Sequence, residues 1–158
     1  MSGAGAPKFA ITGLEGVRVV VIASSWHDVV MDALVANALQ TCQDAGCDVT
    51  LVRVPGSFEL GVAAMRAARS GAFDAIVALG VIIRGGTPHF EFVSSAATDA
   101  LNHVALETLI PVGFGLLTCD NDAQALNRAG LPHSAENKGR EAAEAALMMV
   151  QTMRSLGW

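Results

Sequence analysis

The chain has 158 residues, of which 52% are apolar, and its formal net charge is −5 at pH 7. The negative charge and the lack of a basic run exclude a nucleic-acid partner, whose phosphate backbone requires a track of cationic side chains. No segment reaches the roughly 18 consecutive apolar residues of a membrane span, and the N-terminus lacks the charged and apolar regions of a signal peptide. We therefore expect one cytoplasmic domain over residues 1–158, with residues 1–13 as a mobile or neighbour-docking arm.

The composition also bears on association and on redox state. The apolar fraction exceeds what a well-covered small monomer needs, so we expect part of the surface to be buried against copies of the same chain. Cys42, Cys47 and Cys119 show no CxxC spacing. Their odd number, in a chain without an export signal, indicates reduced thiols.

Strand-like and helix-like patterns alternate along the chain. In chain order the predicted elements are a strand at Val17–Ala23, a helix at Asp28–Ala45, a strand at Asp48–Val54, a helix from Ser57 to Arg69, a strand at Phe73–Ile83, a helix from Thr87 to Leu109, a strand at Val112–Thr118, a short helix from Asp120 to Ala129 and a last helix at Ala135–Leu156. Ser57, Thr87 and Asp120 are the expected N-caps of their helices, with Pro88 at the first helical position of the third.

This alternation predicts an α/β fold, because parallel strands need helical crossovers that cover the sheet on both faces. The expected architecture is a three-layer α/β/α sandwich with a doubly wound, four-stranded parallel sheet in the flavodoxin-like order 2-1-3-4. The strand at Phe73–Ile83 is apolar at nearly every position, as a strand covered on both faces should be. Ligands of such sheets bind beyond the carboxyl ends of the strands.

Three successive strand ends carry side chains that are suited to binding. Trp26 and His27 follow the first strand, Glu59 follows the second, and Arg84 and His89 flank a glycine turn after the third. An indole offers a face for stacking a heteroaromatic ring, and a carboxylate accepts hydrogen bonds from sugar-like hydroxyls. Plain structural readings stay open as well: Trp26 can cover the sheet edge, Glu59 can favour a helix dipole, and Arg84 can pair with a nearby carboxylate.

The turn Gly85-Gly86-Thr87 leads into a helix N-terminus, where free backbone N–H groups favour an anion. The turn is neither a P-loop nor a GxGxxG motif, and a plain capped turn is the alternative interpretation. His89 lies in the first turn of the helix and is a candidate for proton transfer, because imidazole titrates close to neutral pH. His89 and Glu91 alone lack the three or four ligands of a zinc site, so we expect no metal.

Several ordered segments resemble the lumazine synthases, the 6,7-dimethyl-8-ribityllumazine synthases. The specific matches are Val54-Pro-Gly-Ser-Phe-Glu-Leu60, Gly80-Val-Ile-Ile-Arg-Gly-Gly-Thr-Pro-His-Phe90, Phe114-Gly-Leu-Leu-Thr118, Gln124-Ala-Leu-Asn-Arg-Ala-Gly130 and Asn137-Lys-Gly139. The resemblance runs from about Val17 to the final helix. It implies condensation of 5-amino-6-(D-ribitylamino)uracil with 3,4-dihydroxy-2-butanone 4-phosphate, without a cofactor, in riboflavin biosynthesis.

The resemblance also implies a role for each matched site residue. The implied roles are stacking on the pyrimidine ring for Trp26, with His27 beside it; ribityl binding for Gly56, Ser57 and Glu59; a ring pocket of backbone groups from Val81 and Ile82; phosphate binding for Gly86, Thr87 and Arg128; further substrate contacts from Phe114 and Lys138; and proton transfer for His89. In the family the site lies between neighbouring subunits, so Phe114, Arg128 and Lys138 are expected from the adjacent copy of a homo-oligomer.

Three positions depart from the family pattern. Ser57 replaces the usual alanine, which predicts a more polar ribityl pocket; Gly61 replaces a frequent proline, which loosens the start of the second helix; and Ala123 stands where glutamate is common. The connection from Leu131 to Glu136 is longer than in shell-forming members, which favours a homopentamer.

Three other functions compete with this interpretation. A non-catalytic carrier could bind a flavin-like ring, but ring binding alone needs neither His89 nor Arg128. A phosphorelay receiver shares the doubly wound order, but it needs an acidic cluster after the first strand, where this chain has Ser24-Ser25-Trp26-His27. A mainly structural shell protein is the third alternative.

Overall fold

The computed structural model describes residues 11–157 of the chain. Its elements are β1 (Arg18–Ser24), α1 (Asp28–Asp44), β2 (Asp48–Val54), the 3₁₀ helix η1 (Ser57–Glu59), α2 (Leu60–Arg69), β3 (Ala75–Ile83), α3 (His89–Thr108), β4 (Val112–Cys119), α4 (Asp122–Leu126) and α5 (Lys138–Ser155).

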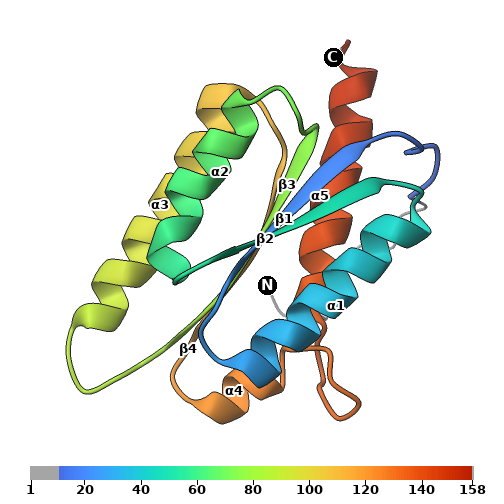
Figure 1. Cartoon of the computed structure of the whole chain (residues 1–158). Helices are drawn as coiled ribbons and strands as arrows, with labels where there is room; N and C mark the ends of the chain where they lie inside the picture. Colours follow the sequence, from blue (N-terminus) through green and yellow to red (C-terminus); the bar gives the residue numbers. More distant parts are fainter. Residues whose placement is uncertain (1–10, 158) are drawn as a thin grey trace.

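The four strands form one parallel sheet in the order β2-β1-β3-β4, and helices cover both faces. Figure 1 shows α2 and α3 on one face of the sheet and α1 and α5 on the other. The predicted three-layer, doubly wound sandwich is therefore confirmed. Since all four strands run in the same direction, their carboxyl ends meet at one edge of the sheet.

The central strand β3 divides the apolar core in two. Its residues from Ala75 to Ile82 are buried, which confirms the expectation of a strand covered on both faces. Alternate side chains enter opposite cores. The core under α1 and α5 takes Ala75, Val77, Leu79 and Val81 from β3, and the core under α2 and α3 takes Ile76, Ala78 and Ile82.

All three predicted N-caps are wrong, and for Ser57 and Asp120 the reason is that the side chain has another hydrogen-bond partner. The hydroxyl of Ser57 is buried and donates to the carbonyl of Val81 at 3.5 Å, so the chain makes the turn η1 before α2 begins at Leu60. The carboxylate of Asp120 accepts from Arg84, and Asn121 caps α4 instead by accepting from the backbone N–H of Gln124 at 3.0 Å.

The other helix boundaries also differ from the prediction. Thr87 is not the N-cap of α3: Pro88 has that position, and its carbonyl accepts from the backbone N–H of Glu91 at 3.2 Å. The last helix starts at Lys138 rather than Ala135, because Asn137 caps it by accepting from the backbone N–H of Arg140 at 3.0 Å. The short helix α4 ends at Leu126 rather than Ala129. The third strand begins at Ala75 rather than at the predicted Phe73.

Glycines allow α5 to approach its neighbours closely. A Cβ added to Gly113 on β4 would lie 2.1 Å from the carbonyl oxygen of Ala142, and one added to Gly139 would lie 2.2 Å from that of Leu34 on α1. Gly61 has the same function between α2 and α3, where an added Cβ would lie 2.4 Å from the Cβ of Ala100. The glycine that replaces a frequent family proline is therefore a packing residue in this chain.

The remaining expectations concern the first residues, the thiols and the membrane. The first ten residues of the expected arm lie outside the described residues, whereas Thr12 accepts from Gln151 of α5 at 2.8 Å. Cys42, Cys47 and Cys119 are free and buried, as expected for reduced thiols, and burial raises the pKa of the Cys42 thiol to about 12. Within residues 11–157, no helix is long and apolar enough to cross a membrane.

We predict that Gly113→Ala lowers the free energy of unfolding by about 1–3 kcal/mol, because the added methyl group overlaps the backbone of α5. Urea unfolding at a fixed subunit concentration measures the difference. Gly85→Ala is the matched control: nothing lies within 4 Å of a Cβ at that position, so its stability should stay within about 0.5 kcal/mol of the native value. Equal stability of the two variants would contradict the close approach of α5 to β4.

Candidate active site

The carboxyl ends of β1 and β2 bring three of the predicted site residues together. A Cβ added to Gly56 would lie 3.1 Å from Glu59 Oε2 and 3.7 Å from Trp26 Nε1. The indole of Trp26 is 67% exposed, so much of its surface is open to a ligand. A glycine at position 56 thus leaves a space that a larger side chain would fill, with a flat aromatic ring and a carboxylate beside it.

The loop that carries Trp26 is held at both of its ends. The hydroxyl of Ser25 donates to the carbonyl of Val54 at 2.8 Å, which ties the loop to the end of β2. His27 adopts the left-handed conformation, with φ of 62° and ψ of 62°, and its carbonyl accepts from the backbone N–H of Met31 at 2.9 Å. Left-handed backbone is uncommon for residues other than glycine and is found at sites where the surroundings fix the chain. The sequence pattern gave no sign of it.

Ser57 lies against the end of β3 rather than in an open pocket. Its hydroxyl points at the carbonyl of Val81, and a Cβ added to Gly80 would lie 2.7 Å from Ser57 Oγ. The side chains of Val81 and Ile82 are buried in the two cores, so they are not open to a ligand. The extra polarity expected from Ser57 is therefore directed at the strand.

The segment from Gly86 to His89 follows β3 and is exposed along its whole length. His89 is the first residue of α3, so the imidazole lies at the positive end of a helix of 20 residues. The N–H groups of this first turn point toward the same end. An anion and a proton-transfer group can therefore occupy neighbouring positions at this edge of the sheet.

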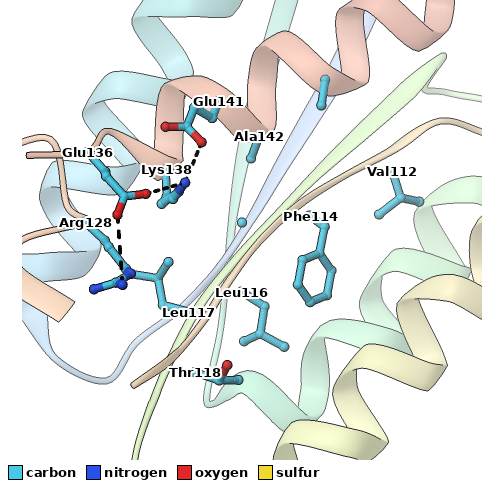
Figure 2. Close-up of a pocket in the computed structure, with 12 residues that line it drawn as sticks. Val112, Phe114, Leu116, Leu117, Thr118, Arg128, Glu136, Lys138, Glu141 and Ala142 are labelled. Carbon is cyan, nitrogen blue, oxygen red and sulfur yellow. Dashed lines mark hydrogen bonds and ion pairs between the residues drawn. The ribbon is translucent and has the colours of Figure 1, made fainter. Parts of the chain in front are cut away.

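A second group of predicted residues lies around β4 and α5, on the walls of a pocket of about 670 Å³. Phe114, Arg128 and Lys138 line it, whereas Trp26 and His89 do not. Figure 2 shows the charged side chains gathered at one end of this pocket, with Phe114 farther along β4. The predicted site residues thus fall into two separate groups in one copy of the chain.

Two carboxylates that sequence analysis missed hold the cations of this pocket. Glu136 lies 2.5 Å from Lys138 Nζ and 3.9 Å from Arg128 Nη2, and Glu141 lies 2.7 Å from the same lysine nitrogen. The hydrogen bond from Lys138 lowers the pKa of Glu136. Burial acts to lower the pKa of Lys138, but its hydrogen bonds to Glu136 and Glu141 raise it overall. Arg128 also donates to the carbonyl of Gln124 at 2.9 Å, which fixes the guanidinium beside the pocket.

A sequence signal existed for only one of these carboxylates. Glu141 stands three residues after Lys138 at the start of a helix, a spacing at which side chains meet. Glu136 lies in the connection before α5. The backbone N–H of Glu136 donates to the carbonyl of Asn127 at 3.0 Å, so the connection folds back toward α4. This turn places the Glu136 carboxylate between Arg128 and Lys138.

These features define a doubly wound α/β protein with candidate binding residues at the carboxyl edge of its sheet and a charged pocket beside β4. The model of the family 6,7-dimethyl-8-ribityllumazine synthase matches residues 16–154. Similar proteins of that name include one from Leifsonia xyli subsp. xyli, 58% identical with 99% of each chain covered. Another, from Streptomyces coelicolor, is 55% identical over 99% of this chain and 97% of its own.

The chain belongs to the 6,7-dimethyl-8-ribityllumazine synthase family. Its function is that of a lumazine synthase, a transferase of riboflavin biosynthesis. The alternative of a phosphorelay receiver is thereby wrong.

We predict that Glu136→Gln removes a pH-dependent part of the stability. Because the pKa of Glu136 is lowered in the folded chain, its ionised form stabilises the fold above the pKa of an unfolded glutamate, about 4.3. This contribution is lost as the pH falls through the lower folded value. The variant should lose on the order of 1 kcal/mol at pH 7, and the loss should become smaller as the pH falls below about 4.3.

Urea unfolding at several pH values, at one subunit concentration, measures this difference. Glu144→Gln is the control. Glu144 pairs with Arg140 at 3.7 Å, both residues lie on α5, and Glu144 does not line the pocket. A loss that is the same at pH 3 and pH 7 would contradict the ionic role of Glu136.

Proposed function

We propose that the chain condenses 5-amino-6-(D-ribitylamino)uracil with 3,4-dihydroxy-2-butanone 4-phosphate at a site between neighbouring subunits, with His89 as the proton-transfer group. The products are 6,7-dimethyl-8-ribityllumazine, phosphate and water. The observation that carries the shared site is the separation of the predicted residues into two groups, of which only Phe114, Arg128 and Lys138 line the pocket beside β4.

One group provides the binding surface for the pyrimidine substrate. Trp26 stacks on the ring, and Glu59 accepts hydrogen bonds from the ribityl hydroxyls in the space beside Gly56. Backbone groups of Val81 and Ile82 complete the ring pocket. This allocation is supported by the short separations among Trp26, Gly56 and Glu59.

The phosphate substrate is held from both subunits. The N–H groups that lead into α3 at Gly86 and Thr87 receive the phosphate from one subunit. Arg128 of the adjacent copy approaches from the other side, because a guanidinium can donate two parallel hydrogen bonds to a phosphate. Lys138 and Phe114 of that copy close the pocket around the substrates.

His89 then moves protons in three steps. The amine of the pyrimidine attacks the ketone and water is lost, which forms an imine. Loss of a proton from the adjacent carbon expels phosphate and leaves an enol, which tautomerises to a second ketone. The second amine attacks this ketone and a second water is lost, which closes the ring. The amine and ketone are reactive and phosphate is a good leaving group, so most of the acceleration comes from holding two substrates in register, which contributes on the order of 7 kcal/mol or more. Proton transfer by a positioned imidazole adds about a hundredfold or more.

Exposed apolar side chains support the association of subunits. Phe58 and Val62 are 62% and 72% exposed on η1 and α2, and Phe92 and Leu106 are 73% and 70% exposed on α3. Single exposed apolar residues are normal in monomers, but several large ones on two adjacent helices indicate a surface that a partner covers. Free cysteines support a reducing compartment, and we include a cytoplasmic location in the proposal.

The test is an assay with both substrates that follows lumazine absorbance, applied to the native chain and two variants. We expect His89→Ala to lower kcat by about a hundredfold with little change in KM for the pyrimidine. We expect Arg128→Ala to raise KM for the butanone phosphate about tenfold or more, because a charged hydrogen-bond donor is lost. No product from the native chain, under conditions where another family member works, would support a non-catalytic carrier. Native kinetics in both variants would contradict the assignment of the two residues.

We predict that the purified protein is a homopentamer. Light scattering of the native chain should give the mass of a pentamer, and the mass of a closed shell built of pentamers would contradict this prediction. A monomer with full activity would contradict the shared site itself.

A further inference from the structure

One arginine at the end of β3 contacts both sides of the proposed phosphate segment. The backbone N–H of Arg84 donates to the carbonyl of Cys119 at 2.9 Å, and its Nε donates to Asp120 Oδ1 at 3.0 Å. Its Nη1 donates to Glu91, and its guanidinium carbon lies 4.1 Å from the centroid of the Phe90 ring. The side chain therefore joins the end of β4 to the first turn of α3.

These contacts lie on both sides of residues 85–89, the segment that carries the proposed phosphate-binding and proton-transfer groups. Residues 85–89 contain Gly86, Thr87 and His89. Arg84 precedes this segment and contacts Phe90 and Glu91, the two residues that follow it. A Cβ added to Gly85 or Gly86 would meet nothing within 4 Å, so the Cβ side of the backbone faces open space at these two positions. Two consecutive glycines leave the backbone with many conformations.

The start of α3 is buried less deeply than its second half. The buried residues of this helix begin at Ala97, about two turns after His89, and in the first two turns Phe90 and Val93 are only partly buried. Core packing therefore fixes the second half of α3 more firmly than the turn that carries the imidazole. The guanidinium of Arg84 adds a polar link between that turn and the end of β4.

We propose that Arg84 is a positioning residue for the reaction, one that holds the phosphate-binding turn and His89 in register with the sheet without touching the substrates itself. The inference rests on the proposed function of Gly86, Thr87 and His89. It concerns geometry more than stability, since exposed ion pairs add little to the free energy of unfolding. A displacement of about 1 Å in an active site, by contrast, can cost on the order of a hundredfold in rate.

The contacts require an arginine in particular. One planar guanidinium donates to Asp120 and to Glu91 while its face covers the ring of Phe90. A lysine ammonium is a point charge on a flexible stem and cannot make all three contacts together. Hydrogen bonds from Arg84 lower the pKa of both carboxylates, so the two pairs remain ionised at neutral pH.

The experiment compares Arg84→Gln, Arg84→Lys and Glu91→Gln with Arg69→Gln in the same two-substrate assay. Arg69 is the matched control, because it is exposed and pairs at 3.5 Å with Glu107 at the opposite end of α3. We expect Arg84→Gln to lower kcat/KM for the butanone phosphate about tenfold, with KM for the pyrimidine within about twofold of the native value. Arg84→Lys should recover only part of the loss, and Arg69→Gln should behave as the native chain.

A double-mutant cycle tests whether Arg84 acts through Glu91. Since either single change breaks the same contact, Glu91→Gln should reproduce part of the loss and add little to Arg84→Gln. Inorganic phosphate, used as a competitive inhibitor, should bind more weakly to Arg84→Gln than to Arg69→Gln. Should Arg84→Gln fail to assemble, Arg84→Lys and Glu91→Gln carry the same comparison.

Two results would overturn the inference. Native kinetics in the Arg84 and Glu91 variants would show that the two residues form only a surface ion pair. An equal loss of kcat/KM for both substrates, together with a lower Tm, would indicate a general structural role. Activity of the native chain in the same assay reports on the proposed function separately.

Discussion

The burial of β3 on both faces is the constraint on which the rest of the structure depends. An apolar strand of this kind is stable only if helices cover it on each side, and only right-handed helical crossovers allow its neighbours to lie parallel to it. The helices α1 and α5 cover one face and α2 and α3 the other. Because the strands are parallel, every strand end with polar or aromatic side chains meets at one edge, and that edge is where Trp26, Glu59 and His89 lie.

Close packing decides where the second group of residues lies. Helix α5 can approach β4 and α1 only because Gly113 and Gly139 have no side chains at the contacts. The approach is supported by a hydrogen bond from Asn137 Nδ2 to Asn37 Oδ1 of 2.7 Å. It brings Lys138, at the first turn of α5, beside the pocket that Phe114 of β4 lines. Gly113 and Gly139 therefore fix the placement of α5, and with it the position of Lys138 beside the pocket.

The charged side chains of the site form chains of contacts rather than isolated pairs. Arg84 links the start of α3 to Asp120, and the backbone N–H of Asp120 donates to Gln124 Oε1 at 2.8 Å. The carbonyl of Gln124 accepts in turn from Arg128, whose other partner is Glu136. The two groups of proposed site residues are thus connected within one subunit, although in a shared-site oligomer they serve two different sites.

The sequence by itself determined the strands and the covering of the sheet on both faces, because the period and length of apolar runs report burial. The alternation of strands and helices indicated the doubly wound order. The sequence also indicated the strand-end residues Trp26, Glu59 and His89. Family motifs added Arg128 and Lys138. Tertiary structure alone decided the caps. The Ser57 hydroxyl donates to the Val81 carbonyl and the Asp120 carboxylate accepts from Arg84, and both partners are distant in sequence. It alone decided that Glu136 lies between two cations and that Gly61 is a packing residue, because the physical cause in each case is a close contact between segments whose separation no local pattern encodes.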